Sequence, residues 1–171
     1  MKHHAVQLYD YHVWANRKLF NRLKELPKEL YDREIQSVFS SISAVIPHVY
    51  ITDSIFLRAI SGDSFDNVRA IAFELMETTK GKSAEEMEEL YTELAERYNA
   101  FFDSQENMDK TIVLEHPQFG RLDSKISEIV QHVVNHGTYH RGNITAMLRQ
   151  MGEAGASMDY IFYLYEIGKT E

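Results

Sequence analysis

Long stretches of this chain repeat apolar residues every three or four positions, and its three prolines, at 27, 47 and 117, leave most of these stretches uninterrupted. Such spacing places the apolar side chains on one face of an α-helix. It predicts four long helices, at about 3–25, from Ser40 or Ser41 to Gly62, from Ser83 through Phe102, and from about Ser124 to Gly152. We expect residues 1–171 to form one all-α domain, most economically a four-helix bundle.

Shorter features refine this prediction. Pro47 falls inside the second long helix, where it removes a backbone donor and should bend the helix beside His48. A short helix is expected at about 70–79. Ser83 and Glu86 have the spacing of a capping box at the start of the third long helix.

Two further segments differ from the long helices. Thr111–Leu114 is rich in β-branched residues, and the turn residues Pro117 and Gly120 follow it. This pattern predicts a short hairpin or an extended loop before the last long helix. The aromatic tail MDYIFYLYEI at 158–167 is expected to fold back onto the bundle.

Charge and composition exclude several classes of function. The formal net charge of −8 argues against a nucleic-acid surface and against docking on an anionic membrane. Neither a membrane-spanning apolar stretch nor a signal peptide is recognisable, so a cytoplasmic protein acting on a small molecule is expected. The chain has no cysteine, which excludes disulfides, thiolate metal sites and a cysteine nucleophile. Any thiol chemistry must therefore use a diffusible thiol.

The histidines carry the most specific chemical signal. Three of the eight, His132, His136 and His140, lie within nine residues at i, i+4 spacing, which places two imidazoles one helical turn apart. Such pairs recur in zinc sites. Eight residues span about 12 Å of helix, so one end histidine cannot share the ion. A third ligand must come from another helix, and spacing alone does not favour His48 over His12.

Three segments together resemble the DinB/YfiT-like metalloprotein superfamily and, within it, the DinB family. The first is YDYHVWANRKLF, near the N-terminus. The second is SISAVIPHVYITDSIFL, in which His48 matches the family's first metal ligand and Asp53 its usual following acid. The third is NHGTYHRGNI, which is similar to the family's H-x-x-x-H-R-G-Q motif, with Asn143 where glutamine is commoner.

The resemblance implies a divalent metal, zinc or nickel, bound by His48, His136 and His140. It also implies a left-handed bundle with up-down-down-up connectivity, and a homodimer. His132 would then be a neighbour that orients a ligand or packs.

Other residues near the motif are expected to be structural. Gly142 would let a neighbouring helix approach closely, and Arg141 would pair with an acid across the bundle. The remaining histidines, His3, His4, His12 and His116, are expected to be exposed or to make only local contacts.

Three functions follow from a three-histidine metal site. The leading hypothesis, from superfamily relatives, is a metal-dependent S-transferase that uses a bacillithiol-like low-molecular-weight thiol on small electrophiles, in detoxification or stress response. The alternatives are a metal-dependent hydrolase and a non-enzymatic metal-binding stress protein. A hydrolase needs a general base, but Asp53 is about 140° around the helix from His48, and Glu74 has no support from the pattern. The catalytic residues are not identified.

Overall fold

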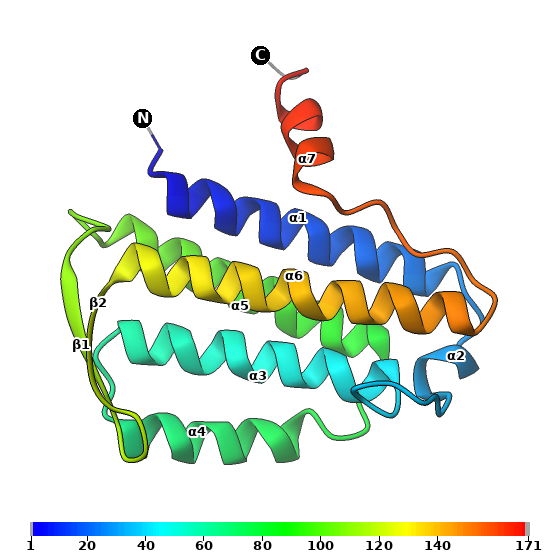
Figure 1. Ribbon diagram of the computed structural model, residues 1–171, viewed down its shortest axis with the longest axis horizontal. Helices are drawn as coiled ribbons and strands as arrows, with labels where there is room; N and C mark the ends of the chain where they lie inside the picture. The colour runs from blue at the N-terminus through cyan, green and yellow to red at the C-terminus, as the bar shows by residue number, and fades with distance from the viewer. Residues whose placement is uncertain (1, 170–171) are drawn as a thin grey trace.

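The computed structural model describes residues 2–169, which are mostly helical and include one small two-stranded sheet (Figure 1). In chain order the elements are α1 (His4–Lys24), α2 (Glu29–Asp32), α3 (Ile42–Ile60), α4 (Phe65–Thr78), α5 (Ala84–Asp103), β1 (Thr111–His116), β2 (Gly120–Lys125), α6 (Ile126–Gln150) and α7 (Tyr160–Ile167). The four long helices predicted from apolar spacing are therefore confirmed as α1, α3, α5 and α6.

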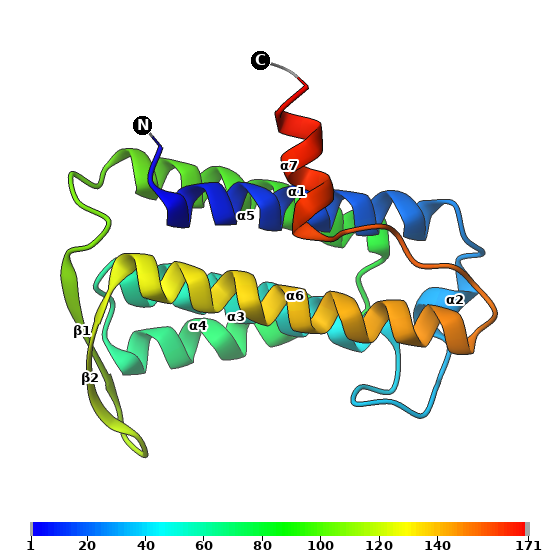
Figure 2. The ribbon, with the colours of Figure 1, turned by 45° about the horizontal axis from the view of Figure 1, so that its top comes forward.

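The long helices lie side by side in both views (Figures 1 and 2). Helices α1 and α3 each contact both α5 and α6, so the apolar faces of all four meet in one interior. The largest fully buried side chains come from every one of these helices, among them His12, Ile42, Ile46, Met87, Leu94, Tyr98, Ile126, Ile144 and Met147. The handedness and connectivity implied by the family resemblance stay predictions.

The helix starts follow from local capping. Ser41 accepts a hydrogen bond from the Ala44 amide at the start of α3. The predicted capping box is confirmed, because Ser83 and Glu86 satisfy each other's backbone amides at the start of α5. The short fourth helix begins at Phe65, five residues earlier than expected, and packs on the outside of α3.

The hairpin and the tail also match the sequence patterns. Strands β1 and β2 pair antiparallel, from Thr111 opposite Lys125 to His116 opposite Gly120. Helix α7 returns to α1, where Tyr163 is buried against Tyr11 and Trp14. Of the helices in the described part of the chain, none is both long enough and apolar enough to span a bilayer.

Candidate metal centre

Three histidines from two helices meet in one place. His136 and His140 lie on α6, and His48 reaches them from α3. Each of the three offers one ring nitrogen, and these nitrogens all lie within 4.8 Å of one another. The Nε2 atoms of His48 and His136 are 3.2 Å apart. We call these three residues the histidine cluster.

The helix periodicity explains why these side chains converge. On α6, Val133, Ile144 and Met147 point into the core. His136 and His140 are one turn apart and lie beside this apolar stripe, toward α3. The ring centroids of His136 and His140 are 4.4 Å apart, and His48 lies 5.1 Å and 4.8 Å from them. Two of the rings, His48 and His136, are only half-buried, so the cluster is open on one side.

Aromatic rings cover part of the cluster. Phe39, from the loop before α3, contacts His48 and His140 at centroid distances of 5.0 Å and 5.5 Å. The exposed Tyr139 contacts His140 edge-on at 4.9 Å. Sequence reasoning did not place Phe39 here, since residues 33–41 show no helical periodicity. Its only signal is that a lone aromatic residue there needs a surface to pack on.

The cluster keeps its imidazoles neutral. Burial, followed by the neighbouring rings of His140 and His48, lowers the pKa of His136 to about 3. Burial also lowers the pKa values of His48 and His140, although Asp53 partly offsets this effect on both. Neutral imidazole is the form that coordinates a metal ion.

The geometry fits a metal ion. In a tetrahedral zinc site with Zn–N distances of about 2.0–2.1 Å, two ligand nitrogens are about 3.3 Å apart. The 3.2 Å between the Nε2 atoms of His48 and His136 is close to this value. The buried Nδ1 atoms of His136 and His140 have no hydrogen-bond partner among residues 2–169, so neither ring is committed elsewhere through that nitrogen. The three residues could therefore hold a divalent cation.

His132 lies beside the cluster and is not one of the three converging histidines. Its ring centroid is 6.1 Å from that of His136 and 4.6 Å from that of Phe56 on α3. Two of the other histidines make local contacts but also reach distant residues, since His3 Nε2 lies 3.5 Å from Asp109 Oδ2 and His116 contacts Phe65 on α4. His3 caps α1 through the Ala5 amide, and the His116 ring packs against Phe65 and Phe119.

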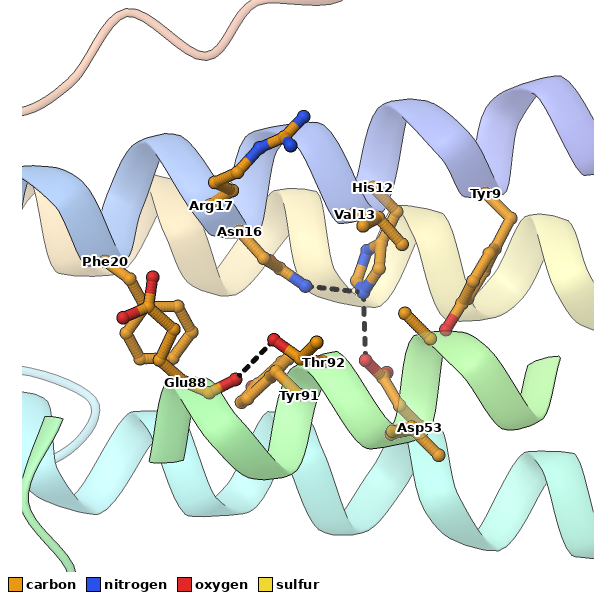
Figure 3. A pocket seen from close by; sticks show the side chains of 12 residues that line it. Tyr9, His12, Val13, Asn16, Arg17, Phe20, Asp53, Glu88, Tyr91 and Thr92 are labelled. Atoms are coloured by element: carbon orange, nitrogen blue, oxygen red, sulfur yellow. Dashed lines mark hydrogen bonds and ion pairs between the residues drawn. The ribbon is translucent and has the colours of Figure 1, made fainter. Parts of the chain in front are cut away.

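The expectation for His12 was wrong. His12 is buried on α1, and its Nε2 lies 2.9 Å from Asp53 Oδ2 and 3.0 Å from Asn16 Nδ2 (Figure 3). Its Nδ1 lies 3.1 Å from Nη1 of Arg141, which can only donate, so Nδ1 accepts and Nε2–H donates to Asp53. Asn16 Nδ2, whose amide oxygen accepts from Arg141, therefore lies beside Nε2 without donating to it. We call His12, Asn16, Asp53 and Arg141 the buried polar network. Burial, its largest influence, lowers the pKa of His12, which agrees with a neutral ring.

The structural expectations for Arg141 and Gly142 were both wrong. Arg141 does not pair directly with an acid, because the neutral His12 ring lies between its guanidinium and Asp53. Arg141 also donates to Asn16 Oδ1 and Thr138 Oγ1. The glycine that permits close helix approach is Gly137, which faces His12, whereas a Cβ atom added at Gly142 would meet no neighbour within 4 Å.

Neither candidate general base is placed at the cluster by a contact. Asp53 directs one carboxylate oxygen to His12, as its position on the far side of α3 from His48 predicts. Glu74 is exposed on α4.

Comparison with known proteins identifies the family of this chain. The family model for the DinB family matches residues 1–170. Protein DinB from Bacillus subtilis (strain 168) is 51% identical over 171 residues, which covers all of this chain and 99% of the relative. The crystal structure of a DinB-like protein from Bacillus cereus ATCC 10987 superposes with a TM-score of 0.65 at 18% identity, over 90% of this chain and 94% of that one, and so shows a shared fold. This chain belongs to the DinB family.

Proposed function

We propose that this protein is a metal-dependent enzyme that binds one divalent cation through His48, His136 and His140. We also propose that α1, α3, α5 and α6 form a left-handed four-helix bundle around this site. The observation that carries the proposal is the convergence of three neutral imidazoles from two helices. Three protein ligands leave coordination positions for a substrate, as in catalytic rather than structural sites. Imidazole ligands suit zinc or nickel, and the family resemblance favours these two.

The reaction we propose is thiol S-transfer to a small electrophile, with a bacillithiol-like thiol as the second substrate. When bound, a divalent ion would supply Lewis acidity that favours the thiolate form of a sulfur ligand. The chain has no cysteine, so the thiol has to be a small molecule. Detoxification or stress response is the role that such a reaction would serve.

A cavity that could admit a small-molecule substrate is separated from the histidine cluster by Phe56 and His132. This cavity, of about 930 Å³, is bounded by α3, α4 and the β1–β2 hairpin. Phe56 lines this cavity and also contacts His132, the neighbour of His136. The rest of the lining is mostly apolar and includes Ile55, Phe65, Val68, Val113, Leu114 and Leu122. This lining would favour electrophiles with an apolar body.

A metal-dependent hydrolase is the second candidate. It requires a general base within hydrogen-bond reach of the attacking water. Asp53 is engaged with His12, and Glu74 is exposed on α4, so neither supports this function. A non-enzymatic metal-binding stress protein is the third candidate, and it would share the same three ligands.

One assay distinguishes the three candidate functions. Zinc- and nickel-loaded protein would be mixed with a small thiol and a chromogenic aryl halide, and release of halide with formation of the thioether would be followed. S-transferase activity should require metal and should be lost in His136→Ala. Hydrolysis of an activated ester without thiol turnover would favour the hydrolase, and loss of both activities in metal-loaded protein would favour the binding protein.

We also propose a homodimer, because the family resemblance implies one. Sedimentation equilibrium of the metal-loaded protein should give twice the 19.9 kDa chain mass. A monomer at micromolar concentration would contradict this part of the proposal.

A further inference from the structure

Phe39 lies against the solvent side of the histidine cluster. Its ring centroid is 5.0 Å from that of His48 on α3 and 5.5 Å from that of His140 on α6, so it spans two members of the cluster from different helices. Phe39 and His48 are both half-buried, whereas Val133 and Ile144, which face the core from α6, are fully buried. Phe39 therefore stands where a small molecule from solvent approaches the cluster.

The loop that carries Phe39 holds its ring in place. Residues 33–41 connect α2 to α3, and the Ile35 amide donates to the Ser40 carbonyl over 2.9 Å, which closes the loop on itself. Ser41, two residues after Phe39, caps α3. Ile35 and Phe39 both pack against the main hydrophobic core. A ring held by packing and by the fixed start of a helix acts as a firm wall.

Tyr139 is the other aromatic residue that covers the cluster from solvent, but it is held less firmly. Its side chain is 59% exposed, and its ring meets His140 edge-on at 4.9 Å. Exposed side chains change rotamer within picoseconds to nanoseconds. Tyr139 can therefore turn aside for an incoming ligand, which leaves Phe39 as the residue that limits the ligand's size.

We propose that Phe39 selects the thiol that reaches a metal held by the histidine cluster. It admits an unbranched primary thiol and excludes a thiol whose sulfur-bearing carbon is branched. This inference rests on the proposed function, because it concerns the coordination positions that the three histidines leave open. A ligand that joins the ion beside His48 and His140 has to share space with the Phe39 ring, and well-packed protein tolerates added methyl groups poorly. The phenyl ring is uncharged, so the selection is by shape.

Cobalt(II) reports this selection without enzymatic turnover, because a thiolate that binds cobalt gives a charge-transfer absorption band. The probes are N-acetylcysteine and N-acetylpenicillamine, which differ by two methyl groups on the sulfur-bearing carbon. Both are titrated into cobalt-loaded wild type, Phe39→Ala and Val38→Ala at one pH, and the ratio of their dissociation constants is compared between proteins. Val38, the neighbour of Phe39 in the same loop, is 68% exposed and serves as the matched control.

The wild type should bind N-acetylcysteine at least about tenfold more tightly than N-acetylpenicillamine, the scale of discrimination that one misfitting carbon gives in an apolar site. Phe39→Ala should reduce this ratio to within about threefold, and Val38→Ala should keep it. Phe39→Leu retains an apolar side chain, so it tests the same point if Phe39→Ala unfolds, and it should also lower the ratio.

The cobalt spectrum recorded without thiol separates selection from a structural role. It should be the same in the wild type and in Phe39→Ala, with equal cobalt content. A changed spectrum would mean that Phe39 holds the histidines in position, and would overturn the proposal. An unchanged thiol ratio in folded, cobalt-loaded Phe39 variants would overturn it too, while leaving the metal site intact. A wild type that binds no cobalt would overturn both this inference and the proposed function.

Discussion

Gly137 lies directly against the ring of His12, where the helix that carries the histidine motif crosses α1. A Cβ atom at position 137 would be 2.3 Å from His12 Cε1 and 2.6 Å from His12 Nδ1. Protein interiors are packed too densely to absorb such a contact without movement. The absence of a side chain at Gly137 therefore lets α6, the helix that carries His136 and His140, pack directly against the buried polar network.

Gly137→Ala should consequently destabilise the fold. Overpacking of this kind typically costs about 1–3 kcal/mol. Gly142→Ala is the matched control, because nothing lies within 4 Å of its Cβ position and alanine favours helix by about 1 kcal/mol. Urea unfolding of the metal-free proteins measures both free energies of unfolding. Equal stability of the two variants would contradict the packing described.

Arg141 and Asp53 should be energetically coupled through His12. Arg141→Met removes the buried guanidinium and leaves the Asp53 carboxylate without a cation nearby, which should cost about 3–5 kcal/mol. The double variant Asp53→Asn/Arg141→Met removes both charges, so it should cost less than the sum of the two single changes. A double-mutant cycle of unfolding free energies measures this coupling, and additivity within about 0.5 kcal/mol would refute it.

The stability of the metal-free protein should fall as pH falls below about 6.5. Unfolded imidazoles titrate near a pKa of about 6.5. Folding lowers the pKa values of His12, His48 and His140, and lowers that of His136 to about 3. Below about pH 6.5 the unfolded state therefore binds more protons, so stability increases with pH between about 3 and 6.5.

The variant His136→Gln isolates one part of this effect. Its unfolding free energy should fall less steeply between pH 7 and pH 5 than that of the wild type, a range above the ordinary carboxylate pKa values. The difference in slope should be below the limit of about 1.4 kcal/mol per pH unit, because His136 is only half-buried. If the wild type and His136→Gln gave identical slopes with a chelator present, the pKa of His136 would be the same in the folded and unfolded states.

Helix α7 can be followed by fluorescence, because Trp14 is the single tryptophan of the chain. Trp14 is 5% exposed, and Tyr163 covers it at a centroid distance of 5.8 Å. Tyr163→Ala should admit water and move the emission maximum to longer wavelength. Tyr165→Ala, on the exposed face of the same helix, should leave the spectrum unchanged. A red shift of equal size in both variants would argue against this packing.

Apolar spacing and local capping were sufficient to predict the long helices, the Ser83 capping box and the hairpin, because each depends on neighbours in sequence. The start of α4 was missed because the helix has no fully buried residue and so only a weak apolar pattern. Its cap, in which Ser64 accepts from the Asn67 amide, is a local signal that could have located it.

The site was less predictable because it depends on contacts between helices. Spacing identified the α6 histidines but could not choose between His48 and His12, which both lie on amphipathic helices. The family resemblance pointed to His48, and the structure brings it to His136. The buried His12 contacts Arg141, 129 residues away along the chain, and no local pattern reveals this pairing.

The proposed function depends on the binding of one divalent ion by His48, His136 and His140. Elemental mass spectrometry of tag-free protein, after incubation with zinc or nickel and removal of free metal, tests this binding most directly. The wild type and His132→Ala should carry about one ion per chain, whereas His48→Ala, His136→Ala and His140→Ala should each lose it while remaining folded. A wild type without metal, or metal retained in any of the three cluster variants, would show that these histidines do not form the metal site.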